Sequence, residues 1–250
     1  MRVDKLGLVS ISFRKNSVIE ILEAMKKAGL FYIEWGSDVH APCDDIDKLK
    51  EIAILQKEFG ITCSSYGTYF RLGENKLEDL QGYIDAAKIL GTNILRLWCG
   101  TKSAFDMSDD EKANLFEECK AAESIARQNG VILCMECHKR TFTEGCDDVV
   151  SLMKYINSEN FKMYWQPFQW QSTDQNIENA KKIAPYTQNI HVFNWENQNK
   201  FPLDQAHDTW RAYLENFPRP RTLLLEFMPN NTLEELTFEA NTLKKIVGEM

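Results

Sequence analysis

Four polar side chains stand at or near the ends of apolar segments in the second half of the chain. Glu136 closes VILCME, Gln166 closes FKMYWQ, His191 lies within NIHVFNW, and Glu226 follows three leucines. They are 30, 25 and 35 residues apart. Two carboxylates, an imidazole and an amide oxygen form a donor set that suits a hard or borderline divalent cation. If the fold brings them together, their types predict a metal site.

Each of these residues also has an ordinary structural interpretation. Glu136 and Glu226 can be salt-bridged residues at strand ends, and His191 can be a satisfied core histidine. Two carboxylates at close range repel, so one of them takes up a proton unless a cation lies between them. The occurrence of four such groups at matching positions favours the metal site.

A strand-and-helix unit that recurs along the chain must position these groups. Apolar strand-like runs recur about every 31 residues, at 6–12, 30–36, 61–67, 93–100, 131–138, 161–166, 189–195 and 221–227. Helix-like segments follow them at 18–28, 44–59, 77–90, 108–129, 147–157, 174–183, 203–217 and 233–247. Ser108 and Glu111 form a capping-box pattern, and Gly29 and Gly130 are typical helix stops.

The repeat predicts a single (β/α)8 TIM barrel, with residues 1–250 as one domain. Runs such as VILCME are apolar without alternation, as parallel strands buried on both faces should be. An open doubly wound sheet would need a glycine-rich turn after the first strand, and SISFRKNS has none. Barrel chemistry lies at the C-terminal strand ends, so we expect the four polar groups to converge there.

Composition limits the classes of partner. The chain has 250 residues, 44% hydrophobic and 26% charged, with a formal charge of −8, which disfavours nucleic acids and anionic membrane surfaces. No apolar stretch is long enough to span a bilayer, and the first residues lack a signal-peptide cleavage site. Seven cysteines, several of them in apolar runs, favour a reducing cytoplasm over a disulfide framework. The composition leaves open whether the protein forms a homo-oligomer.

The repeat and the order of the four groups resemble the xylose isomerase-like (sugar phosphate isomerase/epimerase) TIM-barrel superfamily. That family places a metal-binding Glu, Asp, His and Glu on its last four strands. IEWGSDVH (33–40) and the E-x-H pair Glu136–His138 also match, and HVFNW (191–195) stands where the family often has His followed closely by Asp. The chain departs from the pattern at Gln166, where the family usually has Asp, and at Gln169, where a His often follows. The ligand shell therefore carries about −2 instead of −3, and we expect weaker metal binding.

The resemblance implies a metal-dependent isomerase or epimerase of a small sugar or sugar-like polyol, acting through an enediolate. Glu136 and Glu226 would be metal ligands and the acid–base pair, and the cofactor one divalent ion (Mn, Mg, Co or Zn). One alternative is a metal-dependent dehydratase or lyase of a keto-sugar or cyclitol. Another is a non-catalytic sugar-binding barrel with a degenerate metal site. The DNA-repair endonucleases of this superfamily are disfavoured by the charge of −8.

Further residues beyond the strand ends are candidates for substrate binding. We predict that the carbohydrate substrate contacts five of them, His40, His138, Lys139, Gln169 and Trp35. For Glu34, pairing with a barrel lysine is favoured over contact with substrate. Two roles remain open for the aromatic residues at strand ends, stacking on a sugar or roofing the barrel; these residues are Trp35, Trp98, Trp165, Trp170 and Trp195.

Overall fold

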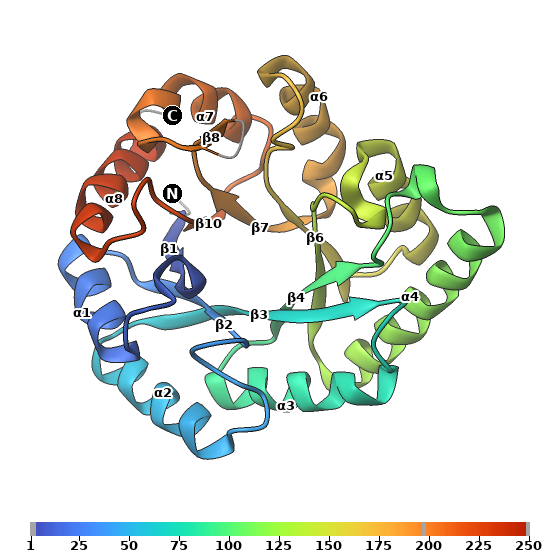
Figure 1. Cartoon of the computed structure of the whole chain (residues 1–250), viewed down its shortest axis with the longest axis horizontal. Helices are drawn as coiled ribbons and strands as arrows, with labels where there is room; N and C mark the ends of the chain where they lie inside the picture. Colours follow the sequence, from blue (N-terminus) through green and yellow to red (C-terminus); the bar gives the residue numbers. More distant parts are fainter. Residues whose placement is uncertain (1–3, 197–198, 249–250) are drawn as a thin grey trace.

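Eight parallel β-strands form a closed ring, and the connecting helices surround it (Figure 1). The computed structural model describes residues 4–196 and 199–248. The order around the ring is β1-β10-β7-β6-β5-β4-β3-β2, and β1 closes it by pairing with both β2 and β10. The barrel strands are β1 (Lys5–Val9), β2 (Tyr32–Gly36), β3 (Thr62–Leu72), β4 (Ile94–Cys99), β5 (Ile132–Glu136), β6 (Phe161–Trp165), β7 (Thr187–Val192) and β10 (Thr222–Leu225). The predicted (β/α)8 fold is confirmed.

The helices lie where the apolar periodicity predicts them. They are α1 (Val18–Ala28), α2 (Ile46–Glu58), α3 (Leu80–Leu90), α4 (Asp109–Asn129), α5 (Cys146–Ile156), α6 (Thr173–Ile183), α7 (His207–Leu214) and α8 (Leu233–Gly248). Ser108 and Glu111 form the expected capping box of α4. Gly130 ends that helix with φ 69°, in the left-handed region that favours glycine.

Three segments differ from the sequence prediction. β3 continues past Gly67 to Leu72, because TYFRL after the glycine is rich in residues that favour strands. β7 ends at Val192, and the chain then forms a small hairpin of β8 (Trp195–Glu196) and β9 (Asn199–Lys200). The expected helix over 203–217 is a 3₁₀ turn followed by the shorter α7.

The core has two parts. The larger lies between the strands and the helices and includes Trp35 and Trp165. A smaller apolar cluster, which contains Tyr164 and Leu224, lies inside the ring. There the Tyr164 ring packs on the His191 imidazole, with centroids 4.4 Å apart. Polar side chains therefore share the barrel interior with a thin apolar layer.

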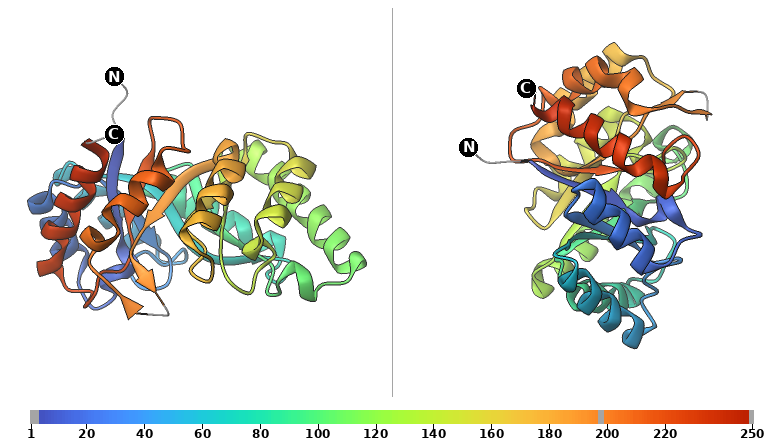
Figure 2. Two further views of the ribbon diagram at one scale, coloured as in Figure 1. Left: turned by 90° about the horizontal axis from the view of Figure 1, so that it is seen from above. Right: turned by 90° about the vertical axis from the view of Figure 1, so that its left-hand side faces the viewer.

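The ends of the barrel chain meet and are tied together. Arg221, just before β10, donates to Asp4, just before β1, and both side chains are buried. α8 also packs beside α1, as Figures 1 and 2 both show. None of the helices in the described part of the chain is long and apolar enough to cross a membrane.

Candidate active site and metal centre

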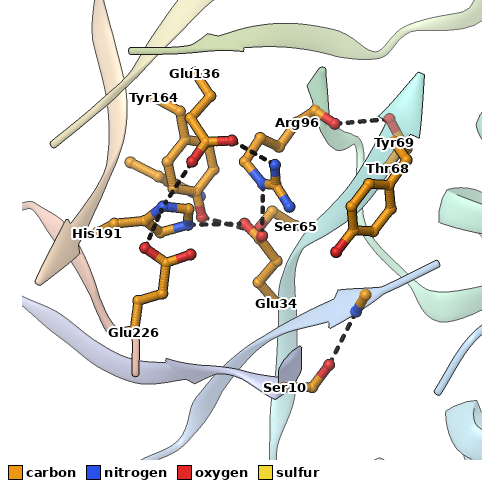
Figure 3. A network of polar contacts seen from close by, with 12 residues as sticks. Ser10, Glu34, Ser65, Thr68, Tyr69, Arg96, Glu136, Tyr164, His191 and Glu226 are labelled. Atoms are coloured by element: carbon orange, nitrogen blue, oxygen red, sulfur yellow. Dashed lines mark hydrogen bonds and ion pairs between the residues drawn. The ribbon is translucent and has the colours of Figure 1, made fainter. Parts of the chain in front are cut away.

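A buried arginine lies at the centre of the barrel mouth. The guanidinium of Arg96, from β4, contacts Glu34 of β2 (Nε–Oε1, 2.8 Å) and Glu136 of β5 (Nη1–Oε2, 2.5 Å) (Figure 3). The three side chains are at most 5% exposed. Burying these charges is tolerable only because they are paired and hydrogen-bonded. The partner of Glu34 is thus an arginine, not the lysine expected from the sequence.

The two oxygens of Glu136 have different surroundings. Oε2 accepts from Arg96 and from the indole N–H of Trp98. Oε1 faces the imidazole of His191, with Nδ1 at 3.6 Å. One oxygen is therefore fixed by two donors, and the other remains directed toward the histidine.

His191 Nδ1 faces three oxygens from three other strand ends. It lies 3.1 Å from Gln166 Oε1, 3.4 Å from Glu226 Oε2 and 3.6 Å from Glu136 Oε1. The amide of Gln166 is oriented by its own N–H, which donates to the carbonyl of Cys137 at 2.8 Å. The four predicted ligands thus converge at one point.

The spacing of these atoms suits a divalent cation. Glu136, His191 and Glu226 each offer one donor atom, and all three atoms lie within 4.8 Å of one another. Metal–oxygen and metal–nitrogen bonds of about 2.0–2.2 Å place neighbouring ligands roughly 3–3.5 Å apart in a tetrahedral or octahedral shell. The distances to His191 Nδ1 are close to this value.

A second group of polar residues holds the other edge of His191. Nε2 lies 3.6 Å from Glu34 Oε2 and has no hydrogen-bond partner in the described structure. Glu34 Oε2 also accepts from Ser65 Oγ at 3.0 Å, and Ser65 lies 3.0 Å from the Tyr164 hydroxyl. A carboxylate behind a histidine ligand is the usual arrangement that sets the tautomer and orientation of its ring. Glu34 is placed to do this for His191.

The cluster strongly perturbs its own protonation equilibria. Burial opposes ionisation of Glu34, but Arg96 and His191 outweigh it and lower the pKa of Glu34 to about 2. Burial alone would lower the pKa of His191, yet Glu226 and Glu34 raise it to about 10. Burial raises the pKa of Glu226 to about 7, although the charge of His191 opposes this. Among the three carboxyls of this cluster, Glu226 is therefore the one whose pKa lies closest to neutral pH.

The charges of the cluster also fit a divalent ion. Glu34, Glu136 and Glu226 contribute three negative charges, and Arg96 returns one positive charge. With His191 neutral, as a metal ligand must be, two negative charges remain. One divalent cation would balance them.

A cavity of about 310 Å³ opens beside Gln166 at the barrel mouth. We call it the mouth cavity. It is lined by Cys137, His138, Lys139, Gln166, Pro167, Gln169, Trp170 and Trp195. Three of the predicted substrate contacts, His138, Lys139 and Gln169, are thus brought together next to a predicted metal ligand.

Trp35 and His40 lie elsewhere. Trp35 is fully buried between β2 and α2, and its indole N–H donates to Gln56. His40 is 3% exposed and contacts Ser10 Oγ at 3.1 Å and the carbonyl of Asn16 at 3.2 Å. Trp35 thus links β2 to α2, and His40 links the loop after β2 to the segment after β1, so both side chains have structural roles away from the metal ligands.

Sequence reasoning missed Arg96 and the Ser65–Tyr164 pair, and it did not predict that Trp98 donates to Glu136. Arg96 did carry a signal, since it stands inside the apolar run NILRLWCG. A charged residue in a strand buried on both faces needs a buried partner of opposite charge. The sequence contains no comparable signal for Ser65 and Tyr164, because serine and tyrosine are common in barrel strands.

Gly67 provides the space that the Glu34–Arg96 pair occupies. A Cβ at this position would lie 2.5 Å from Glu34 Oε1 and 2.9 Å from Arg96 Nη2. We expect Gly67→Ala to displace this pair and lower the free energy of unfolding by about 1–3 kcal/mol. Gly82 is an exposed residue of α3, and a Cβ there would have no neighbour within 4 Å, so Gly82→Ala should instead be neutral or stabilising by up to about 1 kcal/mol. Thermal melts of both variants measure the contrast, and equal melting temperatures would contradict it.

The amino-acid sequence of this chain is similar to that of a curated bacterial enzyme. A curated 3-dehydroshikimate dehydratase from Bacillus anthracis is 21% identical over 167 residues, which cover 66% of this chain and 58% of that protein. The chain therefore spans less than two thirds of that relative's length.

Solved structures share the fold over nearly the whole chain. A probable 3-DHS dehydratase from Bacillus anthracis has a TM-score of 0.82 at 17% identity, covering 96% of this chain and 98% of the other. The IOLI protein with a zinc atom has a TM-score of 0.78 at 18% identity, with 98% of both chains covered. D-psicose 3-epimerase from Clostridium cellulolyticum has a TM-score of 0.69 at 12% identity, covering 97% and 98%.

Residues 22–217 match the family described as Xylose isomerase-like TIM barrel. This match covers most of the chain and agrees with the closed ring of eight parallel strands. The chain belongs to the xylose isomerase-like TIM-barrel family.

Proposed function

We propose that this protein is a metal-dependent isomerase or epimerase of a small sugar or sugar-like polyol that carries a carbonyl group beside a hydroxyl group. The convergence of Glu136, His191 and Glu226 on Gln166, which itself lines the mouth cavity, carries this proposal. Similar proteins include a 3-dehydroshikimate dehydratase and a D-psicose 3-epimerase, and each of these named compounds carries a carbonyl group beside a hydroxyl group.

Glu136 Oε1, Gln166 Oε1, His191 Nδ1 and Glu226 Oε2 would hold the cation, a single divalent ion (Mn, Mg, Co or Zn). When bound, it would supply Lewis acidity to the carbonyl and hydroxyl oxygens of the substrate. Arg96 and Trp98 fix Glu136 so that Oε1 keeps its orientation.

Glu226 is the better base of the two predicted acid–base residues. Its pKa lies near 7, whereas the charges of Arg96 and His191 outweigh burial and hold the pKa of Glu136 well below its usual range. Glu226 removes the proton from the carbon beside the carbonyl, leaving an enediolate. Glu226, which now carries the proton, returns it to the neighbouring carbon in isomerisation. In epimerisation, Glu136 transfers a proton taken up from solvent to the opposite face of the same carbon, and Glu226 releases its own proton to solvent.

Dehydration is the second candidate, favoured by the similarity to the curated 3-dehydroshikimate dehydratase. It begins with the same proton removal, but the enolate then expels a hydroxyl group from the next carbon. His138 lines the mouth cavity and stacks on Trp98, with ring centroids 4.9 Å apart. Its imidazole is placed to protonate the departing hydroxyl.

Solvent-exchange NMR tests the proposal and separates the two reactions. The protein is incubated with Mn²⁺ in D₂O with a panel of ketoses, aldoses and 3-dehydroshikimate. Deuterium at the carbon beside the carbonyl, together with a new stereoisomer or a shifted carbonyl, supports isomerisation or epimerisation. Loss of water to an unsaturated product supports dehydration. If neither deuterium incorporation nor a product is found across the panel, the result would contradict an enzyme and favour the alternative of a non-catalytic sugar-binding barrel.

Gln166 provides a test of the metal site that does not depend on activity. Gln166→Asp adds a negative charge at a ligand position, so Mn²⁺ should bind about 10–100-fold more tightly. Isothermal titration with Mn²⁺ measures this. Gln169→Asp, on the same loop but outside the cluster of donor atoms, is the control and should change the affinity much less. Equal effects of the two substitutions would argue against Gln166 as a ligand.

A further inference from the structure

A second cavity lies beside the mouth cavity, among the loops that follow β6 and β7. Its volume is about 340 Å³. Pro167, Gln169 and Trp195 line both cavities. Because the cavities share these residues, a ligand held in the mouth cavity can extend into its neighbour.

The polar lining of this second cavity is made of amides and hydroxyls, and we call it the amide cavity. It is lined by the amide side chains of Gln169, Gln171, Asn176, Asn194 and Gln205 and by the hydroxyls of Ser172, Thr173 and Thr209. Among its described lining residues, Glu196 is the one charged group. Amides both donate and accept hydrogen bonds, as sugar hydroxyls do. A lining without Lys or Arg offers no counter-charge for a phosphate or carboxylate.

Some of these amides already have structural roles, and others are available. The Asn176 amide already has a structural role, because it accepts a hydrogen bond from the N–H of Phe168 and donates one to the carbonyl of Phe168. Gln169 and Gln205 are exposed, and no hydrogen bond of their side chains occurs in the described structure. These two amides can therefore turn toward a ligand.

Aromatic side chains complete the amide cavity. Phe193, Trp195 and Trp210 line it, and aromatic faces stack well on the C–H face of a sugar ring. The indole N–H of Trp195 is buried and has no acceptor in the described structure. A buried donor without an acceptor is unfavourable, and a ligand hydroxyl would relieve this.

We propose that the amide cavity is a subsite for an uncharged glycosyl unit of the substrate. The substrate then has two parts, a reacting hydroxycarbonyl unit in the mouth cavity and a neutral sugar ring in the amide cavity. This proposal rests on the proposed function for the role of the mouth cavity. The amide cavity itself is tested by binding alone, without turnover.

Binding to the full chain is measured by isothermal titration and ligand-observed NMR. The probes are glucose, galactose, cellobiose, maltose and lactose. We expect at least one disaccharide to bind about tenfold or more tightly than its component monosaccharides. If all three disaccharides bind no more tightly than the monosaccharides, the proposal is overturned, whatever the deuterium-exchange experiment shows.

Two substitutions then locate the disaccharide. Thr209→Trp, from half-buried Thr209 on α7, fills the amide cavity, and Gln205→Ala removes an exposed amide from it. Each should weaken disaccharide binding, Thr209→Trp by about tenfold, with monosaccharide binding unchanged. Gln128→Ala, at an exposed position of α4, is the matched control and should change neither affinity. Thermal melting verifies folding, and unaltered disaccharide affinity in both cavity variants would refute the assignment.

Discussion

Glu226→Gln is expected to lower the rate of deuterium incorporation into the substrate by about 10²–10⁴-fold. The substitution removes the carboxylate that accepts the proton, and general-base contributions are of this size. The amide oxygen can still serve as a ligand in place of Glu226 Oε2, so the loss is one of proton transfer and not of the site as a whole. The rate is measured by NMR in D₂O at saturating Mn²⁺.

The control for Glu226→Gln is Glu215→Gln, which changes an exposed carboxylate after α7 and should leave the rate unaltered. Elemental analysis of the Glu226 variant verifies that the ion is still bound. A rate within about threefold of the wild-type value in metal-loaded Glu226→Gln would exclude Glu226 as the base.

Arg96→Met is expected to lower the free energy of unfolding by about 3–5 kcal/mol at neutral pH, because Glu34 and Glu136 lose the buried charge that balances them. For a chain of this size, the melting temperature should fall by roughly 10 °C or more. Arg127→Met is the control, since Arg127 is 61% exposed and pairs with Glu123 at 3.5 Å. Its loss should lower stability by less than about 1 kcal/mol.

The pH dependence of this effect has a definite sign. The pKa of Glu34 is lowered from 4.5 to about 2 in the folded protein, so its pairing stabilises the fold above pH 4.5. That contribution is lost as the pH falls from 4.5 toward 2. The stability gap between wild type and Arg96→Met should therefore be widest above pH 4.5 and narrow below it. A gap that is small at neutral pH, or that widens on acidification, would show that Arg96 does not balance these carboxylates.

The fold was predictable because its signals are local and repeated. Apolar runs such as VILCME recur eight times at similar spacing, and glycines such as Gly130 mark the ends of the first four helices. The predicted element boundaries were wrong where a local residue type indicated a strand end that the three-dimensional structure does not have. Gly67 suggests a strand end, yet β3 continues past it, and the glycine instead leaves room for a buried ion pair.

The candidate site was predictable only in part. Glu136, Gln166, His191 and Glu226 could be grouped from sequence because each stands near the end of a barrel strand, and topology brings such ends together. The pairing of Arg96 with Glu34 and Glu136 depends on which side chains face inward at the same height in the barrel. Spacing along the chain does not determine this. For the same reason, Trp35 could not be recognised from sequence as a core residue packed against α2.

Anomalous X-ray diffraction from a crystal grown with Mn²⁺ tests the central claim most directly. We predict one strong anomalous peak about 2.0–2.3 Å from Glu136 Oε1, His191 Nδ1 and Glu226 Oε2. The Gln166 amide oxygen should complete the protein ligands, and Arg96 should keep its contact with Glu136. A barrel mouth without a peak at millimolar Mn²⁺, or with His191 still directed at the carboxylates and no ion between them, would contradict a metal-dependent active site.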